Sequence, residues 1–204
     1  MELIEDTIEV AGRRLRLRRP PDPEALLDEE AFEHEEFLPY WAELWPSGMA
    51  LAEAVAARQV RGLRVLELGC GLGLPSLVAA GEGADVLATD WAPDAVALLR
   101  ANAAANDLRL RIEIVSWEEP ERIVREAPFD LVLAADVLYE RRNADRLLEL
   151  LPELGLEILL ADPARLHTER FLEAAAANWR IETTPDTTRP RLAIHRLTRL
   201  THET

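Results

Sequence analysis

Hydrophobic positions along the chain change their spacing near residue 62. Before that point, apolar and polar residues alternate over residues 7–19 around a glycine turn, which predicts a β-hairpin. Closely spaced prolines then break the pattern, and a helix is expected after Pro46, with Ser47 as its N-terminal cap. After residue 62, short apolar runs alternate with segments of helical spacing.

This alternation predicts a Rossmann-like α/β fold, with a doubly wound, mostly parallel seven-stranded sheet. The last two strands are separated only by a turn region, so we expect one antiparallel strand at the C-terminal end. We expect a single domain over 1–204, in which 1–61 form the hairpin and substrate-side segment and 62–204 the core. The expected strands are 63–68, 85–89, 108–115, 129–135, 157–161, 179–183 and 191–197, and the expected helices are 74–80, 94–106, 142–151 and 167–177.

Composition narrows the class of protein. A formal net charge of −15 disfavours general binding to a phosphate backbone, which draws its affinity from Lys and Arg. A single cysteine, Cys70, excludes an internal disulfide, and the four scattered histidines give no expected metal site. The chain has no apolar run of 18 residues and no signal-like N-terminus, so we expect it in the cytoplasm.

A glycine-rich loop is the strongest local signal. The segment 65–73, VLELGCGLG, lies between a predicted buried strand and a helix, where glycines let the backbone turn tightly and approach a ligand. Asp90 follows 21 residues after Gly69, at the tip of the next strand. A carboxylate there can accept hydrogen bonds from both hydroxyls of a ribose.

Two nucleotide cofactors use such a loop, and the spacing of its glycines separates them. Nicotinamide cofactors bind G-x-G-x-x-G, whereas this loop reads G-x-G-x-G and is preceded by Glu67. An acid in that place would repel a pyrophosphate but suits the amino group of a methionine moiety. The sequence therefore favours S-adenosylmethionine, and a dinucleotide enzyme remains the alternative.

Four segments together resemble a known family. They are 39–48 (PYWAELWPSG), 67–73 (ELGCGLG), 130–139 (DLVLAADVLY) and 161–165 (ADPAR), the last with Ala161 in place of a glycine. The 67–73 segment resembles the first motif of class I methyltransferases. The set resembles the seven-strand, non-histone protein lysine methyltransferases of methyltransferase family 16, nearest to the branch that modifies the electron-transfer flavoprotein β-subunit.

The resemblance implies an S-adenosylmethionine-dependent enzyme that methylates protein lysine. It places the methionine and ribose moieties beside the glycine loop, the adenine beside two tryptophans, and the closing walls at Trp45 and Ala135. Ordinary core packing is the alternative for the two tryptophans. The implied cofactor-binding residues are Trp45, Glu67, Gly69, Gly71, Gly73, Asp90, Trp91, Trp117 and Ala135.

A lysine substrate sets its own chemical demands. Its amine must be neutral to attack a methyl group, and with an ordinary pKa near 10.4 the loss of the proton at pH 7 costs roughly 4–5 kcal/mol. An apolar, aromatic pocket lowers that pKa. Tyr40 and Trp41 are expected to bind the substrate and Tyr139 to line the pocket with them, and Asp136 to hold or orient the amine. Asp136 and Tyr139 are the candidate catalytic residues, and capping of the next segment is the alternative for Asp136.

Charge along the chain suggests the kind of partner. Residues 21–43 hold nine acids and no Arg, and they lead into the segment expected to border the active site. Such a field attracts basic protein surfaces and repels phosphates, so we expect a protein substrate with a basic patch. A solvated acidic face is the alternative explanation, and the arginines of 13–19 argue against the charge-based prediction. N-methylation of a small amine and cofactor binding without catalysis also remain open.

Overall fold

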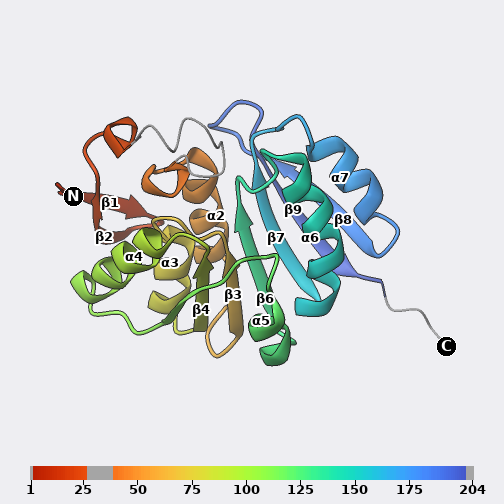
Figure 1. The fold of residues 1–204 in the computed structure, drawn as a ribbon, viewed down its shortest axis with the longest axis horizontal. Coiled ribbons are helices and arrows are strands. Elements are labelled where there is room, and N and C mark those ends of the chain that lie inside the picture. The colour runs from red at the N-terminus through yellow and green to blue at the C-terminus, as the bar shows by residue number, and fades with distance from the viewer. Residues whose placement is uncertain (1, 27–38, 201–204) are drawn as a thin grey trace.

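The computed structural model describes residues 2–26 and 39–200, which form one central sheet with helices on both faces (Figure 1). The sheet has seven strands, as the alternating pattern predicts, and their order is β5-β4-β3-β6-β7-β9-β8. Their bounds are β3 (Arg64–Leu68), β4 (Asp85–Asp90), β5 (Arg111–Ile114), β6 (Leu131–Ala135), β7 (Glu157–Asp162), β8 (Trp179–Pro185) and β9 (Ala193–Arg199).

One strand runs against the others. β3, β4, β5, β6 and β7 pair in parallel, and β9 pairs antiparallel with β7 on one side and β8 on the other. The short connection between β8 and β9 permits only this direction, because parallel neighbours need a long crossover. The prediction of one antiparallel C-terminal strand is confirmed.

Alternate residues of the central strands supply two cores. On β6, Leu131 and Leu133 pack with the buried side chains of α2, α3 and α4, whereas Val132 and Ala134 pack with those of α5, α6 and α7. A strand covered on both faces is apolar throughout, which is why its sequence shows no polar alternation. The helices are α2 (Pro46–Ala56), α3 (Leu74–Gly81), α4 (Pro93–Ala105), α5 (Glu121–Glu126), α6 (Arg141–Leu154) and α7 (Thr168–Ala175), with short 3-10 turns η1 (Pro23–Leu26) and η3 (Tyr40–Ala42).

The N-terminal hairpin of β1 (Ile4–Val10) and β2 (Arg13–Arg19) lies on α4 as a separate two-stranded sheet. Side-chain amides at the C-terminal end of this helix bond to the backbone of β2, as the backbone of a neighbouring strand would. Asn102 Oδ1 accepts a hydrogen bond from the backbone of Arg18 at 2.7 Å, and Asn106 Oδ1 accepts one from Arg16 at 2.8 Å. These bonds fix the hairpin to α4, one of the helices that follow the glycine loop in sequence.

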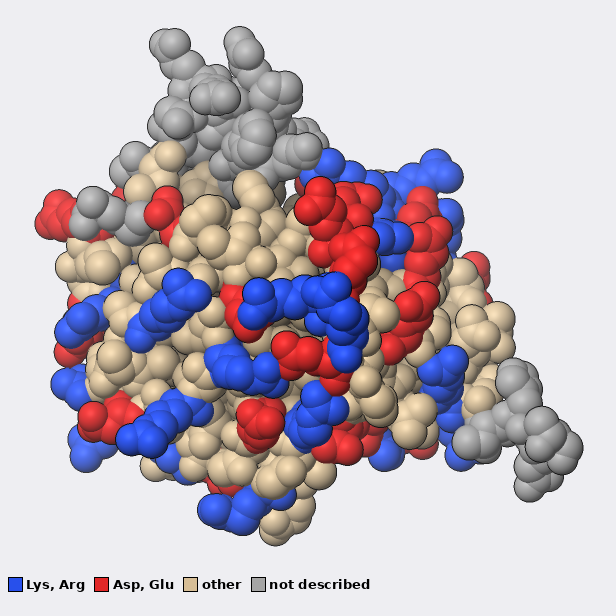
Figure 2. Space-filling model, turned by 60° about the horizontal axis from the view of Figure 1, so that its bottom comes forward, with Lys and Arg blue, Asp and Glu red and all other residues tan. Residues whose placement is uncertain are grey.

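Several arginines of this hairpin have acidic partners within the protein. Arg13 pairs with Glu82, Arg18 with Glu5 and Arg19 with Asp6. On the face in Figure 2, arginines likewise lie interleaved with acidic side chains. These pairings reduce the charge that the arginines of the hairpin present to a partner, which weakens the argument for a nucleic-acid surface there.

Some details differ from the sequence-based expectations. Ser47 is not the cap of α2, because Pro46 already occupies the first helical position and Trp45 precedes it. Helix α5 was not expected, and β5 is shorter than the predicted strand 108–115, because the backbone N–H of Leu108 bonds back to α4. Of the acidic run, residues 27–38 lie outside the described residues. No helix in the described ranges is long and apolar enough to cross a membrane.

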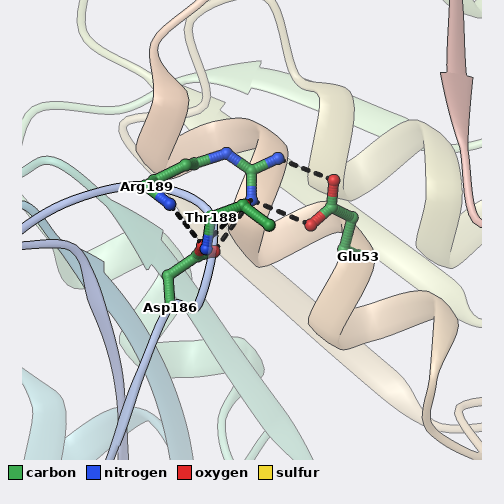
Figure 3. Close-up of polar contacts among 4 residues, drawn as sticks. All are labelled: Glu53, Asp186, Thr188 and Arg189. Carbon is green, nitrogen blue, oxygen red and sulfur yellow. Dashed lines mark hydrogen bonds and ion pairs between the residues drawn. The ribbon is translucent and has the colours of Figure 1, made fainter.

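The β8–β9 loop is held against α2 by one arginine (Figure 3). The Arg189 guanidinium donates two hydrogen bonds to the carboxylate of Glu53, at 2.7 and 3.0 Å, and one to Asp186 at 2.8 Å, and the backbone N–H of Arg189 also donates to Asp186 at 2.8 Å. Asp186 in turn accepts bonds from the backbone and hydroxyl of Thr188. This cluster joins residues that are 136 positions apart in sequence.

We expect Arg189→Ala to lower the free energy of unfolding by about 2 kcal/mol, because it leaves partly buried carboxylates without their charged partner. Arg18→Ala is the control. Its single pair with Glu5 joins two side chains that are 44% and 40% exposed, and such pairs contribute less than about 1 kcal/mol. Urea unfolding of both variants measures the difference. Equal losses in the two variants would show that the cluster in Figure 3 does not brace the loop.

Candidate active site

A cavity of about 720 Å³ opens at the carboxyl ends of the parallel strands. Parallel strands bring the loops that follow them to one edge of a sheet, where α/β proteins of this kind bind ligands. The structure brings every predicted site residue to this one cavity, although their roles stay predictions. Its lining includes Tyr40, Trp41, Trp45, Glu67, Gly69, Gly71, Gly73, Asp90, Trp91, Trp117, Ala135, Asp136 and Tyr139.

The floor of the cavity is the turn between β3 and α3. Gly71 and Gly73 have φ angles of 50° and 70°, in the left-handed region that favours glycine. A Cβ on Gly73 would lie 2.4 Å from a methyl carbon of Leu99, and one on Gly71 would lie 3.1 Å from the carbonyl oxygen of Trp41. Helix α4 and the 39–45 segment therefore approach this backbone as closely as glycine allows.

Glu67 lies inside the cavity wall near the end of β3 and is only 2% exposed. Burial raises the pKa of its carboxyl group to about 8, although hydrogen bonds from the backbone and hydroxyl of Ser76 oppose this shift. The group is thus mostly protonated at pH 7 when only protein surrounds it. A cationic ligand beside it would stabilise the ionised form.

Asp90 ends β4 and faces the same cavity. Burial raises the pKa of its carboxyl group, while backbone bonds lower it. Gly71 donates to one oxygen at 2.9 Å and Ala92 to the other at 3.0 Å. The backbone of Trp91 also bonds to this carboxylate, so Asp90 is oriented by the backbone, and its remaining acceptor capacity faces the cavity.

Two tryptophans border the neighbouring part of the cavity. Trp91 follows β4 and is 45% exposed, so it is not a core residue. Trp117 follows β5 and is partly buried against the core around α6, with its ring 3.4 Å from the position of a Cβ on Gly69. Arg146 donates to the carbonyl oxygen of Trp117 at 2.7 Å and holds that loop. Flat apolar surfaces thus stand beside the Asp90 carboxylate.

Asp136 stands at the other end of the cavity, directly after β6. Its side chain is 6% exposed, and Arg165 contacts both carboxylate oxygens, from Nε at 2.7 Å and from Nη2 at 3.0 Å. Ser47 also lies 3.4 Å from this carboxylate, and the Asp136 backbone, with φ of 57°, donates to Ala161. Arg165 received no role from the sequence, although it belongs to the ADPAR segment.

Aromatic rings surround this end. The ring of Tyr40 lies 5.3 Å from that of Tyr139 and 6.3 Å from that of Trp45, between centroids. Tyr40 and Tyr139 are 41% and 37% exposed, so they stand at the mouth. Burial raises the pKa of the Tyr139 hydroxyl to about 12, which keeps it protonated at neutral pH. Trp41 packs largely against the core, and its main chain supports Gly71.

Cys70 also lines the cavity, in surroundings that disfavour the reactive form of its thiol. Burial raises the pKa of its thiol well above the ordinary value, with the nearby carboxylates of Asp90 and Glu67 adding to the shift. The reactive form of cysteine is the thiolate, which this environment disfavours. The described residues contain no group of three or more metal-ligating side chains.

Solved structures share the fold. The 16S rRNA N2 G1207 methyltransferase of T. Thermophilus, in complex with AdoMet and guanosine, superposes over 97% of this chain and 51% of its own, with a TM-score of 0.73 and 18% identity. The ribosomal protein L11 methylase of Lactobacillus delbrueckii subsp. bulgaricus covers 73% of this chain and 77% of its own, with a TM-score of 0.58 and 24% identity. At these identities the likeness concerns the fold alone.

Sequence relatives are more specific. The electron transfer flavoprotein beta subunit lysine methyltransferase of Xenopus laevis is 36% identical over 135 residues, which cover 62% of this chain and 53% of that protein. Protein N-lysine methyltransferase METTL21A of Danio rerio is 32% identical over 142 residues, covering 64% and 65%. The chain spans about half the length of the flavoprotein-directed relatives. The profile of the lysine methyltransferase family matches residues 36–172, so the chain belongs to that family.

Proposed function

We propose that the protein transfers a methyl group from S-adenosylmethionine to the side-chain amine of a lysine in a protein substrate. One observation carries the proposal. A single cavity joins the buried acids and glycine turn around Glu67 and Asp90 to the aromatic end around Asp136 and Tyr139. The first end has carboxylates that would accept hydrogen bonds from a cofactor, and the second has the groups that a lysine amine requires.

The residues present fit this cofactor. Glu67 would pair with the amino group, Asp90 would accept bonds from the ribose hydroxyls, and the rings of Trp91 and Trp117 would flank the adenine. Glu67 is buried and poised to ionise beside a cation, and Asp90 retains acceptor capacity. S-adenosylmethionine supplies an electrophilic methyl group on a positively charged sulfur.

The protein's own task is then alignment and exclusion of water. Tyr40, Tyr139 and Trp45 give an apolar passage for the lysine side chain, and Asp136 lies where it would accept a hydrogen bond from the amine. The protonated hydroxyl of Tyr139 adds a neutral polar group at the same place. No nucleophile from the enzyme is needed, because the lysine nitrogen attacks the methyl carbon itself.

The openness of this end favours a protein substrate over a free small amine. Tyr40 and Tyr139 are more than a third exposed, and Glu43, Glu118 and Glu140 line the same cavity. Acidic side chains around an open mouth attract a basic surface. Relatives named as protein lysine methyltransferases support the same substrate class.

The direct test is to incubate lysate of the source organism with radiolabelled S-adenosylmethionine and the protein. We expect label on lysine residues of protein, and mass spectrometry identifies the position. Label in RNA or in small molecules would overturn the substrate class. Calorimetry with S-adenosylhomocysteine and NAD tests the cofactor, and binding of NAD alone would overturn the whole proposal.

Asp90→Ala should weaken binding of S-adenosylhomocysteine at least tenfold without unfolding the chain. Two hydrogen bonds from ribose hydroxyls to a charged group are lost, each worth roughly 1.5–3 kcal/mol. Asp94→Ala, which changes an exposed acid in the first turn of the neighbouring α4, is the control. Calorimetry gives both dissociation constants, and an unchanged value for the Asp90 variant would remove Asp90 from the cofactor site.

Glu67 makes cofactor binding depend on pH. Its pKa of about 8 in the free protein means that it is mostly protonated at pH 7, whereas pairing with the amino group requires the carboxylate. Binding at pH 7 should therefore release about one proton, and affinity should rise from pH 6 to 8. Glu67→Gln should abolish the release, and Glu43→Gln should keep it. Calorimetry in buffers of different ionisation enthalpy counts the proton, and no release by the parent would contradict this role.

Asp136→Ala and Tyr139→Phe should lower the transfer rate much more than cofactor affinity. Both side chains lie in the segment after β6, whereas the acids expected to hold the cofactor lie at the ends of β3 and β4. Each variant is assayed for single-turnover transfer and for binding of S-adenosylhomocysteine. Normal transfer by both variants would show that this pair takes no part in the reaction.

A further inference from the structure

The contact between Arg165 and Asp136 has the geometry of a strong ion pair. Two parallel hydrogen bonds of 2.7 and 3.0 Å join the guanidinium to both carboxylate oxygens. The carboxylate is almost fully buried, with 6% of the side chain exposed. Paired forks of this kind are among the strongest polar contacts in proteins, so Asp136 has its charge cancelled before any substrate arrives.

The fold also holds Arg165 in place. Its backbone N–H donates to Asp162 Oδ1 at 2.9 Å, and that fully buried carboxylate accepts a further bond from the hydroxyl of Thr168. The guanidinium lies 5.7 Å from the ring centroid of Trp45, within the range of a cation–π contact. The arginine is thus fixed by the β7–α7 loop on one side and by the N-terminus of α2 on the other.

Arg165 matters because the rest of this cavity is acidic. Arg142 already pairs with Glu140, and Arg146 with Glu149. Without Arg165, a new cation at the aromatic end would face an unopposed carboxylate. The titratable and charged groups that line the cavity or pack behind Asp136 are Tyr40, Glu43, Glu67, Cys70, Asp90, Glu118, Tyr139, Glu140, Arg142, Arg146, Asp162 and Arg165 itself.

We propose that Arg165 is a positioning residue that cancels the charge of Asp136, so that Asp136 accepts a hydrogen bond from the substrate amine without holding it as an ammonium ion. This rests on the proposed function. The lysine first gives its proton to solvent. Its nitrogen then forms the bond to the methyl carbon as the bond from that carbon to sulfur breaks, and the positive charge passes from sulfur to nitrogen.

The physical reason is the effect of a neighbouring charge on an amine. A negative charge within about 4–6 Å raises the pKa of an amine by about 1–3 units, which moves it away from the reactive form at neutral pH. A carboxylate paired with a guanidinium keeps its oxygen lone pairs but carries no net charge with its partner. Asp136 therefore orients the amine, and Arg165 prevents the rise in the pKa of the amine that an unpaired Asp136 carboxylate would cause.

The first experiment measures how transfer depends on pH. The rate of labelling of the protein fraction of the lysate is measured under single-turnover conditions from pH 6 to 10 for four proteins. They are the parent, Arg165→Lys, Arg165→Gln and the double variant Arg165→Gln with Asp136→Asn. We expect Arg165→Gln to shift the midpoint of the profile upward by about one pH unit or more. Arg165→Lys, which keeps the charge, and the double variant, which removes both charges, should restore the midpoint at a lower rate. A lower rate of Arg165→Gln with an unshifted midpoint would overturn the proposal.

The second experiment does not depend on turnover. Butylammonium chloride, which mimics the lysine side chain, is titrated at pH 8 into each variant saturated with S-adenosylhomocysteine. Arg165→Gln should bind butylammonium at least tenfold more tightly than the parent, and the double variant should lose this gain. Equal affinity of the parent and Arg165→Gln would overturn the role of Arg165. If the parent labels no lysine at all, the proposed function fails, and this titration still decides whether Arg165 cancels the charge.

Discussion

The backbone turn between β3 and α3 sets the distances of the whole site. Its glycines allow Leu99 of α4 to approach where a Cβ on Gly73 would collide with it, and the main chain of Trp41 to approach where a Cβ on Gly71 would be crowded. The same turn gives the N–H of Gly71 to the carboxylate of Asp90. Three segments that are distant in sequence therefore meet at one backbone surface, and the cavity is the space left above it.

Three buried carboxylates stand around that space, and each is stabilised differently. Burial raises the pKa of Glu67 to about 8, because the hydrogen bonds from the uncharged Ser76 offset only part of this shift. Asp90 accepts backbone N–H bonds, and Asp136 has a full cationic partner in Arg165. These partners decide what each acid can do: Glu67 can ionise when a cation arrives, whereas Asp136 is already paired.

The spacing of hydrophobic residues was sufficient to predict the order of elements along the chain and the edge of the sheet where the strands end. A strand that is buried on both faces is apolar throughout, so it can be recognised in the sequence. Motif spacing also brought Glu67 and Asp90 together, since they lie at the carboxyl ends of the neighbouring strands β3 and β4. The pairing of Arg165 with Asp136 joins residues 29 positions apart, and that of Arg189 with Glu53 joins residues 136 apart. Such contacts depend on how the loops pack, which no spacing in the sequence records.

The two ends of the cavity differ in what holds them rigid. The cofactor end rests on glycine conformations and backbone hydrogen bonds, which tolerate few substitutions. The substrate end is held by side chains around α2, since Trp45 and Ser47 at its N-terminus face Arg165 and Asp136, and Glu53 on the same helix receives Arg189. Side-chain ion pairs can be exchanged without changing the path of the chain. The fold thus allows the side chains at the aromatic end to change while the glycine turn, which is fixed by main chain, stays the same.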